Sequence, residues 1–339
     1  MTSRNVTIFD VAAEVGLSKS TVSNVLRDTG RFSDETRSAV LEAARRLGYV
    51  ANRAARSLRD GRPGLLGLYI PPSMRFLPYY MEFAFGAAAA AERAGADLAL
   101  LAHRGPHSSR YNVDGAIVVD PRPDEQALDA MLEQNIPVVT AGAYSGTGAD
   151  RIAGVIDVDQ TPIVARALAS HLPTARRAAL LLADRPGTMA WAGRVHAAFF
   201  AECAAAGVEA TDIYVDEALS SGSVSAAVDA ADDFGADLIV CAAETLAGQC
   251  KTLLEHRGRA VGTNPVLVST VASTAELADV TYTRVELHPY AFGDRTVSLL
   301  VDVLNGGTER GTTRWFDAAR IFLPGDPGPR SAESAARQM

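Results

Sequence analysis

The sequence predicts an N-terminal all-α head of the helix-turn-helix type, followed by an α/β body of two doubly wound lobes with parallel sheets. Residues 7–47 place apolar side chains at helical spacing between turn and capping residues. After residue 63, short apolar runs alternate with helical segments, which is typical of parallel sheets covered on both faces. The body has about 280 residues, a length that favours two lobes over one.

Capping and turn residues predict the first two helices of the head. Thr7 and Asp10 form a capping-box-like pair at the start of the first helix. Gly16 readily takes the positive φ of a tight turn, and Ser18 caps a second helix over about residues 19–26. The first helix is expected to turn inward Ile8, Val11, Ala12 and Val15. The second is expected to turn inward Val22, Val25 and Leu26, and outward Lys19, Ser20, Ser23 and Asn24.

A third helix is predicted between Ser33, its cap, and Gly48, which ends it. Its inner face is expected to hold Val40, Leu41, Ala44 and Leu47. Three short helices around a small core make a unit of the size that places a recognition helix in the major groove of DNA.

The charge differs between the two parts of the chain. Residues 1–62 contain 11 Lys+Arg and 7 Asp+Glu, a net charge of +4, whereas residues 63–339 contain 21 and 33, a net charge of −12. This division favours a phosphate-binding head on an acidic body. The alternative is a solvated helical surface that happens to be basic.

Three motifs closely resemble those of transcription repressors of the lactose-repressor (LacI/GalR) family. They are T-I-F-D-V-A from residue 7, G-L-S-K-S-T-V-S-N-V-L from residue 16 and L-G-Y-V-A-N-R-A-A-R-S-L from residue 47. A weaker resemblance continues to about residue 325. It implies the fold of periplasmic sugar-binding proteins for the body, with crossovers between the lobes near residues 158, 288 and 319.

The resemblance also implies roles for residues of the head. The residues at the positions that read bases in the family are Lys19, Ser20 and Asn24. A lysine can donate hydrogen bonds to the acceptors of guanine, and an asparagine can pair with adenine. The hydroxyl groups of the head are better suited to contact phosphate oxygens. Such contacts fix the position of the protein on the duplex and do not read its sequence. The residues assigned to this role are Thr7, Ser18, Thr21 and Ser23.

A short hinge helix is expected after the head. Asn52 can cap residues 53–59, which form a helix too short to be stable alone in water. The resemblance implies that this helix folds on DNA beside its twin in a dimer, enters the minor groove and drives Leu58 between the central base pairs. The alternative for Leu58 is a small core leucine. The remaining hinge residues assigned to the minor groove are Ala55, Arg56 and Arg59.

The domains expected from these patterns are a head over residues 1–50, a hinge helix over 51–62, a body over 63–325 and a disordered tail over 326–339. In the body, the first lobe comprises about residues 63–157 and 288–318, and the second about 158–287 and 319–325. Strands are expected at 65–70, 98–101, 115–119, 137–139, 178–182, 213–215, 238–241 and 266–269. Helices are expected at about 80–94, 124–134, 191–206, 223–234 and 244–256.

Ligands of doubly wound sheets bind outside the carboxyl ends of the strands, which predicts a site in the cleft between the lobes. The resemblance implies a small-molecule effector there, most simply a sugar or related metabolite. Tyr79 and Tyr80 are candidates for stacking on it, or pack against the first body helix instead. Trp191 and Arg194 lie near the family's effector-binding arginine, although a solvated helix start also explains Arg194. Glu244 can accept hydrogen bonds from ligand hydroxyl groups. The alternative is that it only lies in the first turn of a helix, where the helix dipole favours a carboxylate.

Two departures from the family pattern put the effector in question. Residues 269–272 read S-T-V-A where the family has G-F-D-D, so an acidic residue is lost. The link between Leu101 and Asp114 is too short for the family's second helix, and it contains His103, Arg104 and His107, which we interpret as loop.

Several classes of protein are disfavoured. No apolar run is long enough for a membrane span, and the first residues do not resemble a signal peptide, so we expect a cytoplasmic protein. The three cysteines have no metal-ligand spacing and are interpreted as buried thiols. No cofactor or metal site, P-loop or nucleophile elbow is predicted, and hence no enzyme.

The favoured function is therefore a dimeric repressor that binds double-stranded DNA at a palindromic operator and responds to the effector. A dimer is favoured over a tetramer because no heptad zipper follows the body. The alternative is a regulator of the same fold with a degenerate cleft, controlled by a protein partner or by no ligand. A solute-binding protein or a sugar-modifying enzyme is the third hypothesis.

Overall fold

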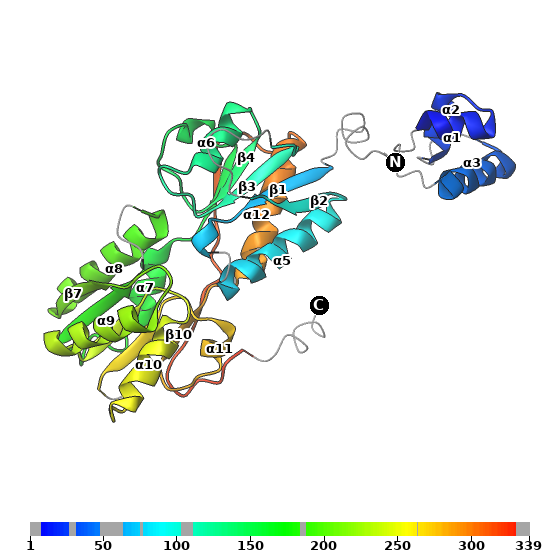
Figure 1. Cartoon of the computed structure of the whole chain (residues 1–339). Helices are drawn as coiled ribbons and strands as arrows, with labels where there is room; N and C mark the ends of the chain where they lie inside the picture. Colours follow the sequence, from blue (N-terminus) through cyan, green and yellow to red (C-terminus); the bar gives the residue numbers. More distant parts are fainter. Residues whose placement is uncertain are drawn as a thin grey trace. The chain divides into compact units, whose positions relative to one another are not determined.

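The computed structural model describes residues 8–26, 32–47, 64–74, 77–102, 111–183, 188–262 and 264–329 (Figure 1). The chain divides after Arg62 into two compact units, the head and the body, and each is described by itself. The predicted fold class is confirmed: a helical head precedes a body of two α/β lobes with parallel sheets. None of the helices in the described residues is long and apolar enough to cross a membrane.

The head consists of α1 (Ile8–Val15), α2 (Lys19–Leu26) and α3 (Asp34–Leu47) in its described part. Gly16 has φ +63° in the turn between α1 and α2, as predicted. The predicted caps are also present, because Ser18 Oγ accepts the Thr21 N–H at 3.1 Å and Ser33 Oγ accepts the Thr36 N–H at 3.2 Å. The core of the head is made by Val11, Ala12, Val22, Val25, Val40, Ala43 and Ala44.

Two predictions about the head were wrong. Leu41, predicted to face inward, is 50% exposed, because the buried stripe of α3 runs through Val40, Ala43 and Ala44 instead. Ser23, predicted to face outward, is only 8% exposed. It lies three residues before Leu26 and therefore on the same side of α2 as that partly buried leucine.

Lobe 1 is built on a sheet whose described strands run in the order β11-β5-β4-β3-β1-β2, all parallel. These strands are β1 (Leu65–Tyr69), β2 (Asp97–Leu100), β3 (Gly115–Val119), β4 (Val138–Ala141), β5 (Gly154–Asp157) and β11 (Thr312–Trp315). The helices are α5 (Pro78–Arg93), α6 (Gln126–Glu133) and α12 (Pro289–Leu304), with short 3-10 turns η1 (Pro72–Met74) and η2 (Ala149–Arg151).

Lobe 2 repeats this plan with strands in the order β12-β10-β9-β8-β6-β7, of which only β12 is antiparallel to its neighbour among the described strands. They are β6 (Arg177–Leu182), β7 (Glu209–Tyr214), β8 (Leu238–Cys241), β9 (Val266–Ser269), β10 (Thr283–Glu286) and β12 (Arg320–Phe322). The helices are α7 (Gln160–Leu168), α8 (Ala190–Ala206), α9 (Ser221–Phe234), α10 (Leu246–His256) and α11 (Thr274–Leu277).

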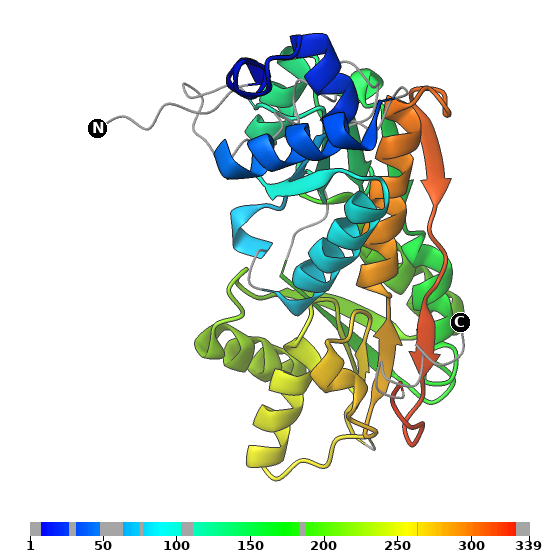
Figure 2. The ribbon, with the colours of Figure 1, turned by 90° about the vertical axis from the view of Figure 1, so that its right-hand side faces the viewer.

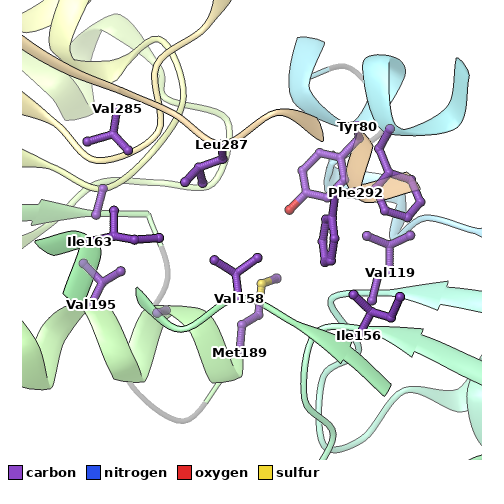
Figure 3. Close-up of a cluster of buried hydrophobic side chains, with 14 of the residues drawn as sticks. Tyr80, Val119, Ile156, Val158, Ile163, Met189, Val195, Val285, Leu287 and Phe292 are labelled. Atoms are coloured by element: carbon purple, nitrogen blue, oxygen red, sulfur yellow. The ribbon is translucent and has the colours of Figure 1, made fainter. Parts of the chain in front are cut away.

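The described chain passes from one lobe to the other after β5, after β10 and after β11. One cluster of buried apolar side chains continues through these crossings from lobe 1 into lobe 2. Figure 3 shows Val158, at the first crossing, between Ile156 of lobe 1 and Val195 of lobe 2. The two lobes therefore share a hydrophobic core at their junction, next to the carboxyl ends of their strands.

Helices α5 and α12 pack closely along one face of lobe 1 (Figure 2). Each contributes a glycine at the contact. A Cβ atom on Gly86 would lie 1.9 Å from the Tyr290 carbonyl oxygen, and one on Gly293 would lie 2.1 Å from the Phe83 carbonyl oxygen. The two backbones approach so closely that no side chain fits between them at these positions.

A buried arginine holds the C-terminal segment on lobe 2. Arg284 is fully buried and donates to the carbonyl oxygens of Leu277 (2.9 Å), Leu323 (3.1 Å) and Asp326 (2.9 Å). Its guanidinium also lies 5.5 Å from the centroid of the Phe322 ring. Asp326, expected at the start of a disordered tail, thus belongs to the packed segment; residues 330–339 lie outside the described residues.

Candidate functional site

The start of α2 gathers exposed donors on one face of the head. Lys19 and Ser20 are exposed, and Ser18 Oγ lies 2.8 Å from both Ser20 Oγ and Thr21 Oγ1. Lys19 Nζ lies 4.7 Å from the centroid of the Phe9 ring, which is itself 61% exposed. The start of α2 therefore combines hydroxyl groups, an ammonium group and the positive end of the helix dipole. This arrangement suits hydrogen bonding to phosphate oxygens and to acceptor atoms of bases.

Of the residues predicted to contact DNA, Lys19, Ser20 and Ser18 are exposed, and Thr21 and Asn24 are partly exposed. Ser23 is buried, and this removes the basis for its predicted phosphate contact. Thr7 and the hinge residues Asn52, Ala55, Arg56, Leu58 and Arg59 lie outside the described residues. Phe9 was not singled out from the sequence, although a phenylalanine outside the predicted inward face of the first helix could have drawn attention to it.

The body contains a cavity between its lobes, at the carboxyl ends of both sheets. Its empty space, the open mouth included, is about 980 Å³. Tyr79, Tyr80, Trp191 and Glu244, four predicted effector-binding residues, all line it. The fold therefore brings together side chains that are up to 165 residues apart in the chain.

The wall on lobe 1 is aromatic. Pro78 starts α5 directly after the cavity segment, so that Tyr79 and Tyr80 stand in its first turn. Their rings meet edge to face with centroids 5.1 Å apart. The Tyr80 hydroxyl donates to Asp120 Oδ2 at 3.0 Å, just beyond the end of β3. Tyr80 is buried and Tyr79 partly so, and both residues line the cavity. That they stack on an effector stays a prediction.

The wall on lobe 2 carries a buried carboxylate. Glu244 is 5% exposed, and its Oε2 accepts the backbone N–H of Tyr79 at 2.9 Å. The bond joins the loop after β8 to the N-terminal turn of α5 across the cavity. Burial raises the pKa of Glu244 to about 7, with smaller contributions in the same direction from Glu276 and Glu82. Glu244 precedes α10, but its carboxylate bonds to the backbone at the start of α5.

Arg194 does not line the cavity, in contrast to the prediction. It is not a solvated helix start either, because its Nη2 donates to Asp157 Oδ1 at 2.6 Å. Asp157 ends β5, lines the cavity and also accepts the Val158 N–H at 2.9 Å. Burial raises the pKa of Asp157 more than the Arg194 guanidinium lowers it. Arg194 therefore positions a cavity carboxylate from behind.

Two more side-chain contacts join the lobes around the cavity. Arg122 Nη2 of lobe 1 lies 2.6 Å from Glu217 Oε1 of lobe 2. On the other side, Thr274 Oγ1 of α11 donates to Glu82 Oε1 of α5 at 3.0 Å. Together with the bond between Glu244 and Tyr79, these contacts hold the two lobes against each other in this structure.

Both units of the chain match known protein families. The profile of "Bacterial regulatory proteins, lacI family" matches residues 7–52, and that of "Periplasmic binding protein-like domain" matches residues 168–321. The head thus matches the DNA-binding region of LacI-family regulators and the body matches periplasmic binding proteins, as the resemblance predicted. The protein is a DNA-binding transcriptional regulator similar to those of the LacI family.

One related regulator aligns with most of the chain, and another with less than half of it. "HTH-type transcriptional regulator CelR" of Thermobifida fusca is 27% identical over 322 residues, 90% of this chain and 94% of that protein. The maltose regulon regulatory protein MalI of Escherichia coli (strain K12) is 35% identical over 155 residues, 42% of this chain and 44% of that protein.

Solved structures share the fold. The Lac repressor dimer bound to operator and the anti-inducer ONPF has a TM-score of 0.75 at 19% identity, covering 95% of this chain and 99% of that one. The transcriptional regulator CelR–cellobiose complex has a TM-score of 0.65 at 22% identity, with the same coverage of both chains.

Three carboxylates of the cavity were not predicted from the sequence: Asp120, Asp157 and Glu217. Asp120 and Asp157 belong to lobe 1. Asp120 directly follows the apolar strand β3, and Asp157 is the last residue of the apolar strand β5. The rule that ligands bind at the carboxyl ends of parallel strands would have identified them. His103, Arg104 and His107 of the shortened link lie outside the described residues, while residues 111–114 form no helix. Thr270 and Val271, at the lost G-F-D-D motif, line the cavity without an acidic group.

The raised pKa of Glu244 predicts a pH dependence of stability. The ordinary value is 4.5 and the folded value about 7, so the native state binds the extra proton between these pH values. Stability should therefore decrease as pH rises from 4.5 to 7 and level off above. Glu244→Gln, which keeps the acceptor for Tyr79, should show a flatter profile in urea unfolding at pH 5, 6, 7 and 8. Parallel profiles for the two proteins would contradict the assignment.

Proposed function

We propose that the protein is a dimeric, sequence-specific repressor without catalytic activity, which binds a palindromic operator and responds to a small molecule in the cleft. The single observation that carries the proposal is the exposed start of α2. There Lys19 and Ser20 point into solvent on a head that matches the family profile. The Lac repressor neighbour, which is a dimer bound to operator, supports both the dimer and the symmetric site.

In this proposal α2 enters the major groove. Lys19 donates to guanine acceptors and Asn24 pairs with adenine, while Ser20 contacts a neighbouring base edge. Thr7, Ser18 and Thr21 contact phosphate oxygens and set the position of the head on the duplex. The Phe9 ring restricts Lys19 before binding, which lowers the entropy lost when the ammonium group engages a base.

The hinge completes the proposed DNA contact. Asn52 caps a short helix that folds in the minor groove, with Ala55, Arg56 and Arg59 along the groove. Leu58 is inserted between the central base pairs and bends the duplex. A flexible central step, of which C-G is the expected one, makes this distortion less costly.

Replacing Asn24 by alanine should relax the preference at one base position in each half-site. A lost bidentate contact to adenine costs about 1–3 kcal/mol at that position and leaves the other positions unchanged. Binding to a set of single-base operator variants, measured at fixed salt, gives the profile. Ser38→Ala, on the exposed side of α3, serves as the control. A uniform drop on every sequence would instead assign Asn24 to a phosphate contact.

The dimer is proposed to use an apolar surface on lobe 1, formed by Met81 and Phe85 of α5 and Leu100 of β2. These side chains are 46%, 60% and 59% exposed. Helix α5 packs beside β2, an edge strand of the described sheet, so the three residues belong to neighbouring elements. Exposed apolar groups that gather in this way are typical of a protein interface.

Replacing Phe85 by glutamate should convert the dimer into monomers and lower operator affinity at least about tenfold, because a buried unpaired charge is costly in an apolar interface. Analytical ultracentrifugation measures the first effect. Trp315→Glu is the matched control, since Trp315 is 61% exposed on β11 at the opposite edge of the same sheet. A Phe85→Glu protein that remains dimeric would place the interface elsewhere.

The decisive experiment is selection of bound DNA from a random pool by the purified full chain. We expect a motif with two-fold symmetry, two half-sites read by α2, and a flexible central step. The absence of any sequence preference at moderate salt, with or without metabolites, would overturn the proposal. An asymmetric or single half-site would overturn the dimer alone.

The effector is proposed to be a sugar or a related metabolite, as in the CelR–cellobiose complex. The alternative of a degenerate cleft is disfavoured by the cavity itself, which keeps aromatic and charged residues from both lobes. Thermal melts with a metabolite panel distinguish the two, because a ligand of the folded state raises the melting temperature by mass action. No shift with any compound would favour control by a protein partner.

A further inference from the structure

Phe9 is an exposed aromatic residue beside the start of α2. It is the second residue of α1, and its side chain is 61% exposed. The inward face of α1 consists of Val11, Ala12 and the partly buried Val15, so the core of the head does not depend on the Phe9 ring. A single exposed apolar residue is ordinary on a protein surface, and its neighbours decide whether it has a role.

The neighbour that gives Phe9 a role is Lys19, the first residue of α2. Its Nζ lies over the Phe9 ring, 4.7 Å from the ring centroid. An ammonium group in this position is attracted to the negative face of the ring. Helices α1 and α2 also pack on each other, so the contact belongs to a fixed pair of helices. The ring and the ammonium group are therefore presented together to a partner of α2.

The contact limits how far apart the two groups can bind along a duplex. Successive bases of one strand are about 3.4 Å apart along the helix axis. With the ring centroid 4.7 Å from Nζ, a ring that stays in contact with Lys19 reaches the base pair that Lys19 contacts or the adjacent one. Phe9 and Lys19 should therefore address consecutive base pairs.

The major groove offers one kind of apolar partner to such a ring. The base edges there present hydrogen-bond donors and acceptors together with the C5 methyl group of thymine. Contact between the ring and this methyl group removes apolar surface of both from water, which is favourable. A phosphate group offers only charged acceptor oxygens, which suit the lysine and not the ring. The thymine methyl group is thus the part of the duplex that matches Phe9.

We propose that Phe9 is a specificity-determining residue of the head, whose ring packs on the C5 methyl group of a thymine next to the base pair that Lys19 reads. The inference deepens the proposed function and rests on it, because it requires α2 in the major groove. Lys19 donates to a guanine, and a G·C pair contains no thymine, so the thymine belongs to the adjacent base pair. The two residues together select a two-base element in each half-site.

Replacing thymine by uracil tests the methyl contact without changing the protein. Uracil keeps the base pairing and the O4 acceptor of thymine and lacks only the methyl group. Each thymine of the selected operator is replaced in both half-sites at once, and the dissociation constant of the full-length protein is measured at fixed salt. We expect one position to lose affinity about tenfold or more, since one buried methyl group contributes about fourfold in each half-site. If no replacement changes the affinity more than about twofold, the inference is overturned.

Phe9→Ala assigns the methyl contact to this side chain. We expect the preference for thymine over uracil at that position to fall to about twofold or less. Leu41→Ala is the matched control, because it also truncates an exposed apolar side chain of the head, which is 50% exposed on α3, and it should keep the full preference. A preference that persists in Phe9→Ala, or that is lost equally in both variants, overturns the inference.

Lys19→Ala locates the contact along the operator. Selection from a random pool with this variant should relax the preference at one position in each half-site. The thymine that depends on Phe9 should lie in the base pair next to that position. A thymine two or more base pairs away would overturn the joint recognition by Phe9 and Lys19.

The outcomes also separate this inference from the proposed function. A protein that selects a symmetric operator but binds its thymine and uracil forms alike keeps the repressor function and overturns the role of Phe9. A single half-site that contains a thymine dependent on Phe9 overturns the dimer and supports the inference. A protein that selects no sequence overturns both.

Discussion

Gly293→Ala is expected to destabilise the body by about 4 kcal/mol or more, or to prevent its folding at 37 °C. The added Cβ would lie 2.1 Å from the Phe83 carbonyl oxygen and 3.1 Å from the Ala87 backbone nitrogen. Both atoms are backbone, so no rotamer change relieves the clash and the two helices must separate. Separation opens the core under α5 and α12, which includes Phe83 and Phe292 with ring centroids 5.5 Å apart.

Urea unfolding of purified variants measures this effect, and soluble yield serves where the variant does not fold. Gly86→Ala should behave in the same way, since its Cβ would lie 1.9 Å from the Tyr290 carbonyl oxygen. Gly222→Ala is the control: it lies in α9 with nothing within 4 Å of the added atom, and should be neutral or stabilising by up to about 1 kcal/mol. Similar stabilities of Gly293→Ala and Gly222→Ala would contradict the close helix contact.

Arg284→Met is the second large prediction, with an expected loss of about 3–5 kcal/mol. Methionine fills a similar volume but cannot donate to the carbonyl oxygens of Leu277, Leu323 and Asp326. Those acceptors would be left without their donor at a fully buried site, and each unsatisfied buried group costs about 1–3 kcal/mol. Residues 323–329 should then detach from lobe 2.

Limited proteolysis and chemical unfolding report the two parts of this effect. Arg320→Met provides the matched control, because Arg320 is exposed and its guanidinium lies 5.1 Å from the same Phe322 ring. It should change stability by less than about 0.5 kcal/mol, as surface substitutions usually do. If the two variants are equally stable, the hydrogen bonds of Arg284 do not hold the segment.

The head shows how far local patterns reach. The bounds of α2, the positive φ of Gly16 and the caps at Ser18 and Ser33 were all predicted, because each depends on residues within one or two turns. The errors concern Ser23 and Leu41, which lie at the border of an apolar stripe. Whether such a residue is buried depends on how the neighbouring helix packs, and helical periodicity does not contain that information.

The partners of the cleft residues could not be predicted from local sequence patterns. Tyr79, Tyr80, Trp191 and Glu244 were predicted near a ligand through the family resemblance, and the structure does place them on one cavity. The partners were not predicted: Glu244 bonds the start of α5, and Arg194 bonds Asp157 rather than facing the cavity. These pairs lie 165 and 37 residues apart in the chain, so the order of strands and the contact of the lobes decide them.

By itself the sequence determined the order of helices and strands, the division into a basic head and an acidic body, and the resemblance of the chain to LacI-family regulators. These properties depend on short-range periodicity, capping and motif spacing, which the chain carries without folding. Only the tertiary structure decided which carboxylates have a cation, which glycines separate two helices and which arginine is buried. Burial and pairing depend on neighbours that are distant in sequence, and those neighbours exist only after the sheets and lobes have assembled.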